Sequence, residues 1–491
     1  MNSIWNNNLS AFKKRFPALA HIYKNQIDFI SNAFAKVQDD VVGDPSTALV
    51  VSQLFPFWKL EKARSGEWTA SEKGIYLHSK YRPDSGNAIP EMEKKGVKIF
   101  LGCGLGYELR NFCKSCQNEN NGGVVLLEPD PAHFFGALCV LDWTCVFEIE
   151  KLVIALSCPI DQIIPLCEKD STKIDYVLNP AFIKHDEEYF ISVKKLLDRN
   201  IRKNQINENT KRKFGKLWER NARMNAKYAE LCDGVETFRG VFENDERPWL
   251  LVAAGPSLEK ILPNMKKLKE KCIVICVDTA LRAMLKGGVE PDFIVLTDPQ
   301  FWAYMHIAGL KSPSSILIAD AVSYPAVFRF QCKKIIISSS PFPIAKDLKK
   351  PFEGKGLLES GGSVATVAWS FAVMAGAKKI YTAGLDLSFP KKQTHIKGST
   401  FEQAVHRVST KIMTSERRTS DILFGADISV AKDYNGNDVL TDSRMKMFAW
   451  WFESKIASNP GVETFTLCPE SMVIPGVKLG KNPESFPKKN L

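Results

Sequence analysis

The stretch "LVAAGPSLEK", residues 251–260, joins an apolar strand to the start of a helix. Its first four residues are apolar without alternation, which is typical of a strand covered on both faces in a parallel sheet. Gly255 and Pro256 then form a tight turn, and Ser257 stands where the helix begins. Free backbone N–H groups at a helix start can bind an anion such as a nucleotide phosphate. A packed turn with a capped helix explains the same residues, so both interpretations stay open.

The same alternation of strand and helix recurs on either side of this stretch. Strands are predicted at residues 248–254, 272–278, 292–298, 314–320, 333–339 and 378–384. Before the last of these, apolar residues spaced i, i+3, i+4 and i+7 predict a helix over residues 363–375, with Ser363 as its N-cap. This rhythm predicts a doubly wound, Rossmann-like α/β domain.

The N-terminal half carries a second series of short apolar runs. Strands are predicted at residues 97–106, 122–130, 144–150, 151–157 and 173–180. After about residue 390 the strand signals fade, and residues 441–461 predict an amphipathic helix. The predicted fold class is therefore α/β, with two Rossmann-like doubly wound domains and a mostly helical C-terminal region. The predicted parts are an N-terminal domain (1–200), a helical connector (201–235), a central domain (236–395) and a C-terminal domain (396–491).

Composition and charge narrow the class of protein. The chain has 491 residues, 45% of them hydrophobic, and a net charge of +11. Part of that charge lies in residues 200–228, which we interpret as an exposed helix, and we predict no nucleic-acid partner. No apolar run approaches the roughly 20 residues that span a bilayer, and the N-terminus has no apolar segment fit for a signal peptide. We expect a soluble, cytoplasmic protein without a membrane span.

Small and polar residues follow the strands of the central domain at the points where those strands end. The carboxyl ends of parallel strands meet at one edge of a sheet, so these residues are expected to form a polar rim around a nucleotide. The chain lacks the Walker pattern, which argues against a P-loop ATPase. Each residue could instead cap a helix or form a turn. The predicted nucleotide-binding residues are Gly255, Pro256, Ser257, Asp278, Thr279, Thr297, Asp298, Ser338, Gly361, Gly362 and Ser363.

The N-terminal half has a glycine-rich turn of its own, "GCGLG", at residues 102–106. Glu128 ends the next strand, and an acid at that distance can hold ribose hydroxyls of a dinucleotide or S-adenosylmethionine. "LNPAF" (178–182) partly matches the Asn-Pro-Pro-aromatic motif of amino-methyltransferases but lacks the second proline. A purely structural Rossmann-like domain is the alternative.

Residues 251–300, which include "GPSLEK" and "PDFIVLTDPQ", resemble the motility accessory factor (Maf) family of bacterial flagellin glycosyltransferases. Supporting segments are "GGSVATVAWSFAVMAGAKKIYTAGLDLSF" (361–389), "THIKGS" (394–399) and "DYNGNDVLTDSRMKMFAWWFE" (433–453). The resemblance implies a sialyltransferase-like central domain that binds a nucleotide sugar and catalyses its transfer, in the bacterial cytoplasm. It also implies that the flanking domains bind the acceptor.

The implied reaction moves a nonulosonic acid, pseudaminic or legionaminic, from its CMP-activated form to Ser or Thr hydroxyls of flagellin, as flagellum assembly and motility require. The departing phosphate gains negative charge, which helix N-termini at the rim can stabilise. His395 and Asp386 are the candidate catalytic residues that could accept the acceptor's proton. His395 as a loop histidine without a role, and Asp386 as a structural cap, are the alternatives. We predict no metal ligand, and no cofactor beyond the CMP-sugar substrate; whether a divalent metal takes part stays open.

Two rival functions remain. A related pterin diphosphokinase family shares the G-P-S-L and G-x-x-P-D segments, would require Mg²⁺, and is expected to carry more acids where this chain has "TDPQ" (297–300). The other rival is a non-enzymatic flagellin-binding or export accessory protein. Intact glycine turns and rim acids favour an active site over a decayed one.

Overall fold

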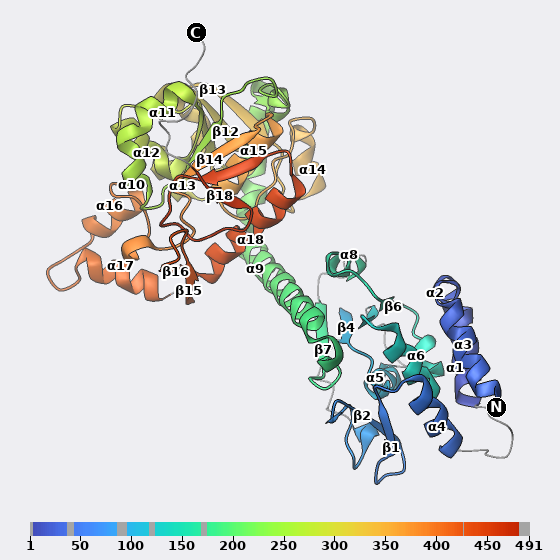
Figure 1. The fold of residues 1–491 in the computed structure, drawn as a ribbon. Coiled ribbons are helices and arrows are strands. Elements are labelled where there is room, and N and C mark those ends of the chain that lie inside the picture. The colour runs from blue at the N-terminus through green and yellow to red at the C-terminus, as the bar shows by residue number, and fades with distance from the viewer. Residues whose placement is uncertain are drawn as a thin grey trace. The chain divides into compact units, whose positions relative to one another are not determined.

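The computed structural model describes residues 3–36, 44–85, 96–116, 123–167, 174–425 and 427–480. The chain forms two compact units, Met1–Glu208 and Asn209–Leu491 (Figure 1). Helix α9 (Glu187–Leu231) begins in the first unit and ends in the second. Its second part corresponds to the predicted connector at 201–235. Each unit has its own buried core.

The first unit contains a four-stranded parallel sheet in the order β6-β5-β4-β7. Its strands are β4 (Val97–Leu101), β5 (Val124–Glu128), β6 (Leu152–Leu156) and β7 (Ile174–Leu178). The helices that follow β4 and β5 are α5 (Tyr107–Cys116) and α6 (Pro131–Val140), and α8 (Ile163–Cys167) follows β6. Ahead of the sheet lie α1 (Ser3–Arg15), α2 (Pro17–Ile22), α3 (Lys24–Lys36), α4 (Asp44–Leu54), β1 (Lys59–Lys62), β2 (Trp68–Glu72) and β3 (Ile75–Tyr76).

Four of the five strands predicted for this half are confirmed, and the one at 144–150 is wrong. Its residues start with the short helix α7 (Thr144–Phe147), which buries Val146 and Phe147 and packs against α1 and α5. A short apolar run is typical both of a buried strand and of a buried helical turn. Over so few residues, the periodicity of the apolar residues cannot distinguish the two.

The second unit is built on a nine-stranded sheet in the order β18-β17-β14-β9-β10-β11-β12-β13-β8, with every neighbouring pair parallel. All six predicted strands are confirmed, and the fold is α/β as expected. The strands are β8 (Asp233–Gly234), β9 (Trp249–Val252), β10 (Ile273–Val277), β11 (Phe293–Leu296), β12 (Lys311–Asp320), β13 (Gln331–Ser338), β14 (Lys379–Ala383), β17 (Glu463–Thr466) and β18 (Val477–Leu479).

The switch point of this sheet lies between β9 and β14. From β9 the chain proceeds outward through β10 to β13, then crosses back and places β14 on the other side of β9. Leu251 of β9 is paired with Ile275 on one side and with Thr382 on the other. Loops at the carboxyl ends of strands that flank a switch point diverge and leave room for a ligand. Residues 251–260 therefore lie at the switch point.

Helix α15 (Val364–Met374) makes the crossover and packs against β9, β10 and β11. Ser363 occupies the predicted N-cap position, although its side chain makes no capping hydrogen bond. The helix ends just before Gly376, whose φ of +104° suits glycine.

The segment after residue 396 contains the predicted helices and four strands that the sequence did not predict. The helices are α16 (Thr400–Arg407), α17 (Ser415–Phe424) and α18 (Ser443–Ser458), the last within the predicted 441–461. Strands β15 (Ile428–Lys432) and β16 (Asp438–Asp442) form a hairpin, whereas β17 and β18 extend the central sheet beyond β14. These four strands mix charged or polar residues with apolar ones, so they lack the continuous apolar run that identified the other strands.

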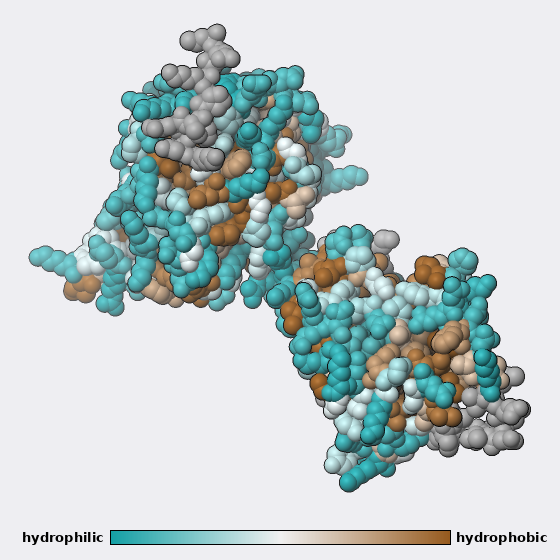
Figure 2. Space-filling model, viewed as in Figure 1, coloured by the Kyte–Doolittle hydropathy of each residue, from teal (hydrophilic) through white to brown (hydrophobic). Residues whose placement is uncertain are grey.

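No helix among the described residues combines the length and the hydropathy needed to cross a bilayer. The face shown in Figure 2 is mostly hydrophilic, with hydrophobic patches on both units.

Candidate functional site

The loops after β9 and β14 interlock at the switch point. The Gly255 N–H donates to the carbonyl of Gly384 at 2.9 Å, and the Ala253 N–H donates to the carbonyl of Ala383 at 2.8 Å. A Cβ atom on Gly384 would overlap the Ala253 carbonyl and lie 2.9 Å from Leu258 Cβ, and its φ is +73°. Only glycine allows the two loops to approach so closely.

Asp386 occupies the turn that we predicted would bind a phosphate. Its carboxylate accepts the Ser257 N–H at 2.9 Å and also the Ser257 hydroxyl. The helix that follows, α10 (Leu258–Ile261), is only four residues long. Burial raises the pKa of Asp386 to about 6, opposed by the hydrogen bonds from Ser257. Asp386 thus makes the capping contact of the structural alternative, while a catalytic role for it stays a prediction.

Two acids lie at the ends of the next strands. Asp278 starts α12 (Asp278–Lys286) and accepts the Thr279 N–H at 2.8 Å, and Asp298 accepts the Gln300 N–H at 2.8 Å. Burial, followed by the nearby charge of Asp298, raises the pKa of Asp278 to about 8. Burial also raises the pKa of Asp298. At neutral pH this pair holds a proton and can both donate to and accept from a hydroxyl-rich ligand.

The remaining predicted rim residues make local contacts. Thr297, the residue that follows β11, is buried. The Ser338 hydroxyl donates to the Ala319 carbonyl at 3.5 Å. The Pro256 carbonyl accepts the Glu259 N–H at 3.2 Å.

The glycine pair at the start of α15 packs against α18. A Cβ atom on Gly361 would overlap the indole of Trp451, and Gly362 has a φ of +91° close to the Phe448 ring. The structure therefore uses Gly361 and Gly362 for close packing, and their predicted contact with a nucleotide stays a prediction.

Two asparagines of α9 hold the rim loops in place, and the sequence did not indicate them. Asn221 Nδ2 donates to the carbonyls of Pro299 and Val322, at 2.9 and 3.0 Å. Asn225 Nδ2 donates to the carbonyls of Ala321 and Ser323, at 3.0 and 2.8 Å. Both side chains are fully buried, so the loops after β11 and β12 are fixed by the helix that leads into this unit.

A third buried acid, Asp320, ends β12. Its carboxylate accepts the Val322 N–H at 2.7 Å, and burial raises its pKa to about 7. Three neighbouring strands thus have a fully or largely buried acid at their carboxyl end or within two residues of it, a concentration typical of functional sites.

A cluster of cationic and imidazole groups lies over the same edge, and we call it the nitrogen cluster. It consists of Arg282 on α12, His306 on α13 (Phe301–Ile307) and His395 in the segment after β14. The Phe401 ring is 4.8 Å from the His306 ring and 4.6 Å from the His395 ring, between ring centroids. Of these three residues, only His395 was predicted from the sequence.

Three nitrogen atoms of this cluster are buried and make no hydrogen bond among the described residues: Arg282 Nε, His306 Nδ1 and His395 Nδ1. Burial lowers the pKa of both histidines to about 4, with smaller contributions from His395 and Arg282 at His306 and from Arg444 at His395. Buried polar atoms without partners are costly, and acceptor oxygens of a ligand would satisfy such atoms. The chemistry of the cluster suits a phosphate or carboxylate.

The glycine-rich turn of the first unit is filled by the chain's own side chains. A Cβ atom on Gly104 would lie 2.5 Å from the Phe182 ring and 2.9 Å from His78 Nε2. Glu128, predicted to hold ribose hydroxyls, instead accepts the Cys103 N–H at 3.1 Å and contacts His185 at 2.8 Å.

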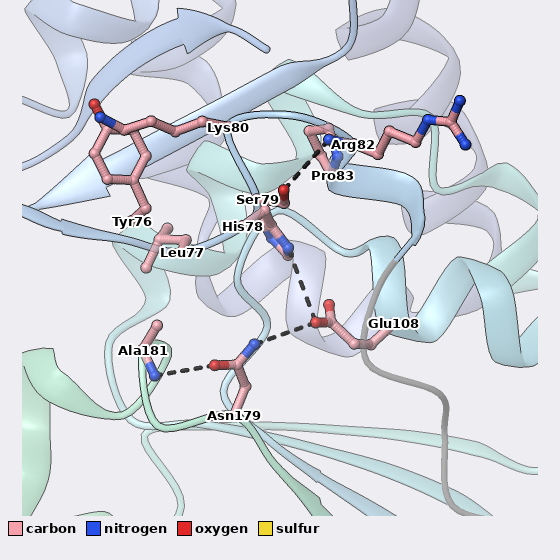
Figure 3. Close-up of a pocket in the computed structure, with 10 residues that line it drawn as sticks. All are labelled: Tyr76, Leu77, His78, Ser79, Lys80, Arg82, Pro83, Glu108, Asn179 and Ala181. Carbon is pink, nitrogen blue, oxygen red and sulfur yellow. Dashed lines mark hydrogen bonds and ion pairs between the residues drawn. The ribbon is translucent and has the colours of Figure 1, made fainter. Parts of the chain in front are cut away.

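A cavity of about 520 Å³ lies beside this turn, where β4 and β7 end (Figure 3). Glu108 is 93% buried within its wall; its Oε1 accepts the Asn179 amide at 3.3 Å, and its Oε2 has no partner among the described residues. His78 Nδ1 is 3.8 Å from Oε1. The cavity is lined by Tyr76, Leu77, His78, Ser79, Lys80, Arg82, Pro83, Glu108, Asn179 and Ala181.

Replacing Glu108 by glutamine is expected to stabilise the first unit at alkaline pH. Burial raises the pKa of Glu108 from 4.5 to about 7, so its ionisation destabilises the fold as pH rises through that value. Urea unfolding should show a gain of about 2 kcal/mol at pH 8.5 and little change at pH 4. The exposed Glu148→Gln is the control. A Glu108→Gln protein that is less stable at pH 8.5 than the unmodified chain contradicts the expectation.

Comparison with known proteins agrees with this architecture. The fold places the chain among α/β proteins with Rossmann-like sheets. Within that class it shares its fold with the solved MAf glycosyltransferase of Magnetospirillum magneticum AMB-1, with a TM-score of 0.56 and 16% identity, covering 100% of this chain and 76% of that one. The 6-hydroxymethylpterin diphosphokinase MptE-like family model matches residues 220–392.

Relatives exist in Treponema pallidum (strain Nichols). One uncharacterized protein is 32% identical over 224 residues, which are 40% of this chain and 57% of that protein. A second is 27% identical over 173 residues, 34% of this chain and 30% of that protein. The chain thus spans little more than half of one relative and less than a third of the other.

Proposed function

We propose that the second unit is a glycosyltransferase that moves a nonulosonic acid from its CMP-activated form to Ser or Thr hydroxyls of flagellin. The nitrogen cluster carries the proposal, because three buried nitrogen atoms without partners suit the phosphate of CMP. The fold shared with a MAf glycosyltransferase supports the transferase class. The sequence resemblance supports the sugar and the acceptor.

In the proposed reaction the bond between the sugar's anomeric carbon and the phosphate oxygen breaks, and the acceptor oxygen bonds to that carbon. The Arg282 guanidinium would stabilise the negative charge that CMP gains as it departs. Asp278 and Asp298 would exchange hydrogen bonds with ribose or sugar hydroxyls.

The acceptor's proton must be removed in the same step, and His395 is our candidate. Its pKa of about 4 keeps the imidazole neutral at physiological pH, so it is free to accept a proton. Negative charge developing on the phosphate beside it favours the imidazolium and raises its basicity as the reaction proceeds.

Exposed aromatic side chains on α13 could hold the sugar or the acceptor. Phe301 and Trp302 are 50% and 53% exposed, and the Phe301 ring is 5.7 Å from that of Tyr324, whose N–H donates to the Asp298 carbonyl. Large exposed aromatics beside a polar site are typical of binding surfaces.

Calorimetric titration with CMP tests the proposal. We expect binding that weakens at least tenfold in both Arg282→Gln and His306→Gln, since each variant removes a nitrogen that the phosphate would satisfy. His406→Gln, which alters an exposed histidine on α16, is the matched control and should bind as the unmodified chain does. Equal CMP affinity in all four proteins would refute the phosphate site.

A pterin diphosphokinase is the second candidate, favoured by the family model over 220–392 and by the adjacent acids Asp278 and Asp298. Carboxylates of this kind hold Mg²⁺ with substrate phosphates. Incubation with ATP, Mg²⁺ and 6-hydroxymethylpterin distinguishes the two candidate functions. Only a diphosphokinase transfers the diphosphate to the pterin and releases AMP.

A further inference from the structure

Two histidines and three carboxylates gather beside the glycine-rich turn of the first unit. They come from β2, β5, α6 and the 3₁₀ helix η3 (Lys184–Asp186), and they are Glu72, Glu128, Asp130, His133 and His185. Four of these side chains are no more than 10% exposed, and Asp130 is half-exposed. Segments distant in the sequence thus bring five ionisable groups into one largely buried place.

The carboxylates orient the two imidazoles. His133 Nε2 lies 2.9 Å from Glu72 Oε2, and its Nδ1 lies 3.2 Å from Asp130 Oδ2. His185 Nε2 lies 2.8 Å from Glu128 Oε1. A carboxylate on one ring nitrogen is the arrangement that fixes the tautomer and direction of a metal-binding histidine.

Ligand atoms of Glu72, His133 and His185 converge. One such atom from each residue lies within 4.8 Å of the other two. Small adjustments of the side chains would bring all three to the bond lengths of about 2.0–2.2 Å that nitrogen and oxygen ligands make with Zn²⁺. The two rings stack with centroids 3.9 Å apart, so one of them must tilt to point its lone pair at a shared ion.

The three carboxylates of this group give it negative charge, which a bound cation would compensate. Among the described residues, no Lys or Arg forms an ion pair with any of the three carboxylates; their ionic partners are His133 and His185. Both nitrogens of His133 face carboxylates. A divalent ion beside His133 and Glu72 would compensate the negative charge of these carboxylates.

We propose that Glu72, His133 and His185 bind a divalent transition metal of the zinc type, with Asp130 and Glu128 as positioning residues. Imidazole and carboxylate ligands suit Zn²⁺, and three protein ligands leave a coordination position for water or a small ligand. Glu128 also accepts the Cys103 N–H, so the ion would brace the turn after β4. This site belongs to the first unit and does not rest on the proposed transferase function.

Metal analysis of the purified full chain tests the proposal. The protein is stripped with a chelator and titrated with Zn²⁺ against a chromophoric competitor. We expect one tightly bound equivalent in the unmodified chain, and affinity at least 100-fold lower in His133→Gln and His185→Gln. His406→Gln removes an exposed histidine and should leave the bound equivalent unchanged.

Because a change in this buried group can unfold the first unit, circular dichroism is recorded for each variant. Asp130→Asn keeps the oxygen that caps α6 through the Ala132 N–H and should weaken Zn²⁺ binding 10- to 100-fold while the protein stays folded. A melting temperature of the unmodified chain that Zn²⁺ leaves unchanged, together with no bound equivalent, would overturn the proposal. So would equal Zn²⁺ affinity in folded His133→Gln and His185→Gln. CMP affinity is measured separately and is expected to be the same in these variants.

Discussion

Gly384→Ala is expected to cost the second unit at least 4 kcal/mol of unfolding free energy, which is enough to leave much of the protein misfolded. The new Cβ would overlap the Ala253 carbonyl and lie 2.9 Å from Leu258 Cβ. A φ of +73° adds the strain of a left-handed alanine. Urea unfolding followed by circular dichroism measures the loss.

Gly436→Ala provides a matched control. Its φ of +83° is as unfavourable for alanine, but nothing lies within 4 Å of the added Cβ. We therefore expect only the backbone strain, about 1 kcal/mol. If both variants lose the same amount, the interlocking of the β9 and β14 loops has no energetic importance.

Asp278→Asn is expected to raise the unfolding free energy of the protein and also to reduce the proposed transfer of the sugar. The folded-state pKa of Asp278, about 8, stands above the 3.8 of an ordinary aspartate, so its contribution to stability falls as pH rises from 3.8 through 8. Asparagine keeps the acceptor for the Thr279 N–H and cannot ionise. One pKa unit is worth about 1.4 kcal/mol, which bounds the gain at about 6 kcal/mol, and relaxation around a buried charge reduces it to about 2–4 kcal/mol at pH 8.5.

The measurement compares urea unfolding at pH 4 and pH 8.5, with the exposed Asp421→Asn as control. At pH 4 the gain should be small, because the aspartate is protonated in the folded state. Under the proposed function, transfer of the sugar should fall at least tenfold, since a hydroxyl-binding carboxylate is lost. A variant that is less stable than the unmodified chain at pH 8.5 would show that the Asp278 charge is compensated.

The six main strands of the second unit could be predicted because each is a continuous apolar run in the sequence. Runs such as 272–278 are apolar without alternation, which is typical of a strand buried on both faces of a parallel sheet. The same rule failed at 144–150, where Val146 and Phe147 are buried by a helical turn. It also missed β17 and β18, whose charged residues interrupt the apolar run.

The candidate site could be predicted only in part, because its contacts join distant segments. Polar residues after strand ends identified the edge of the sheet and the acids Asp278 and Asp298. Nothing in the sequence shows that Asp386 accepts a hydrogen bond from Ser257, which is 129 residues away. Its carboxylate thereby occupies the turn that was predicted to bind a phosphate. Arg282 and His306 lie inside helices, so their only signal is a polar residue within an otherwise apolar helix.

The position of β17 has a practical consequence for dissecting the chain. β14 pairs with β9 on one side and with β17 on the other, and the strand that pairs with it arrives some 80 residues later in the sequence. A fragment ending at residue 395 would leave the backbone of β14 unpaired along that side. Exposed strand edges of this kind recruit other chains and aggregate. The nine-stranded sheet is therefore complete only when the chain extends through β18.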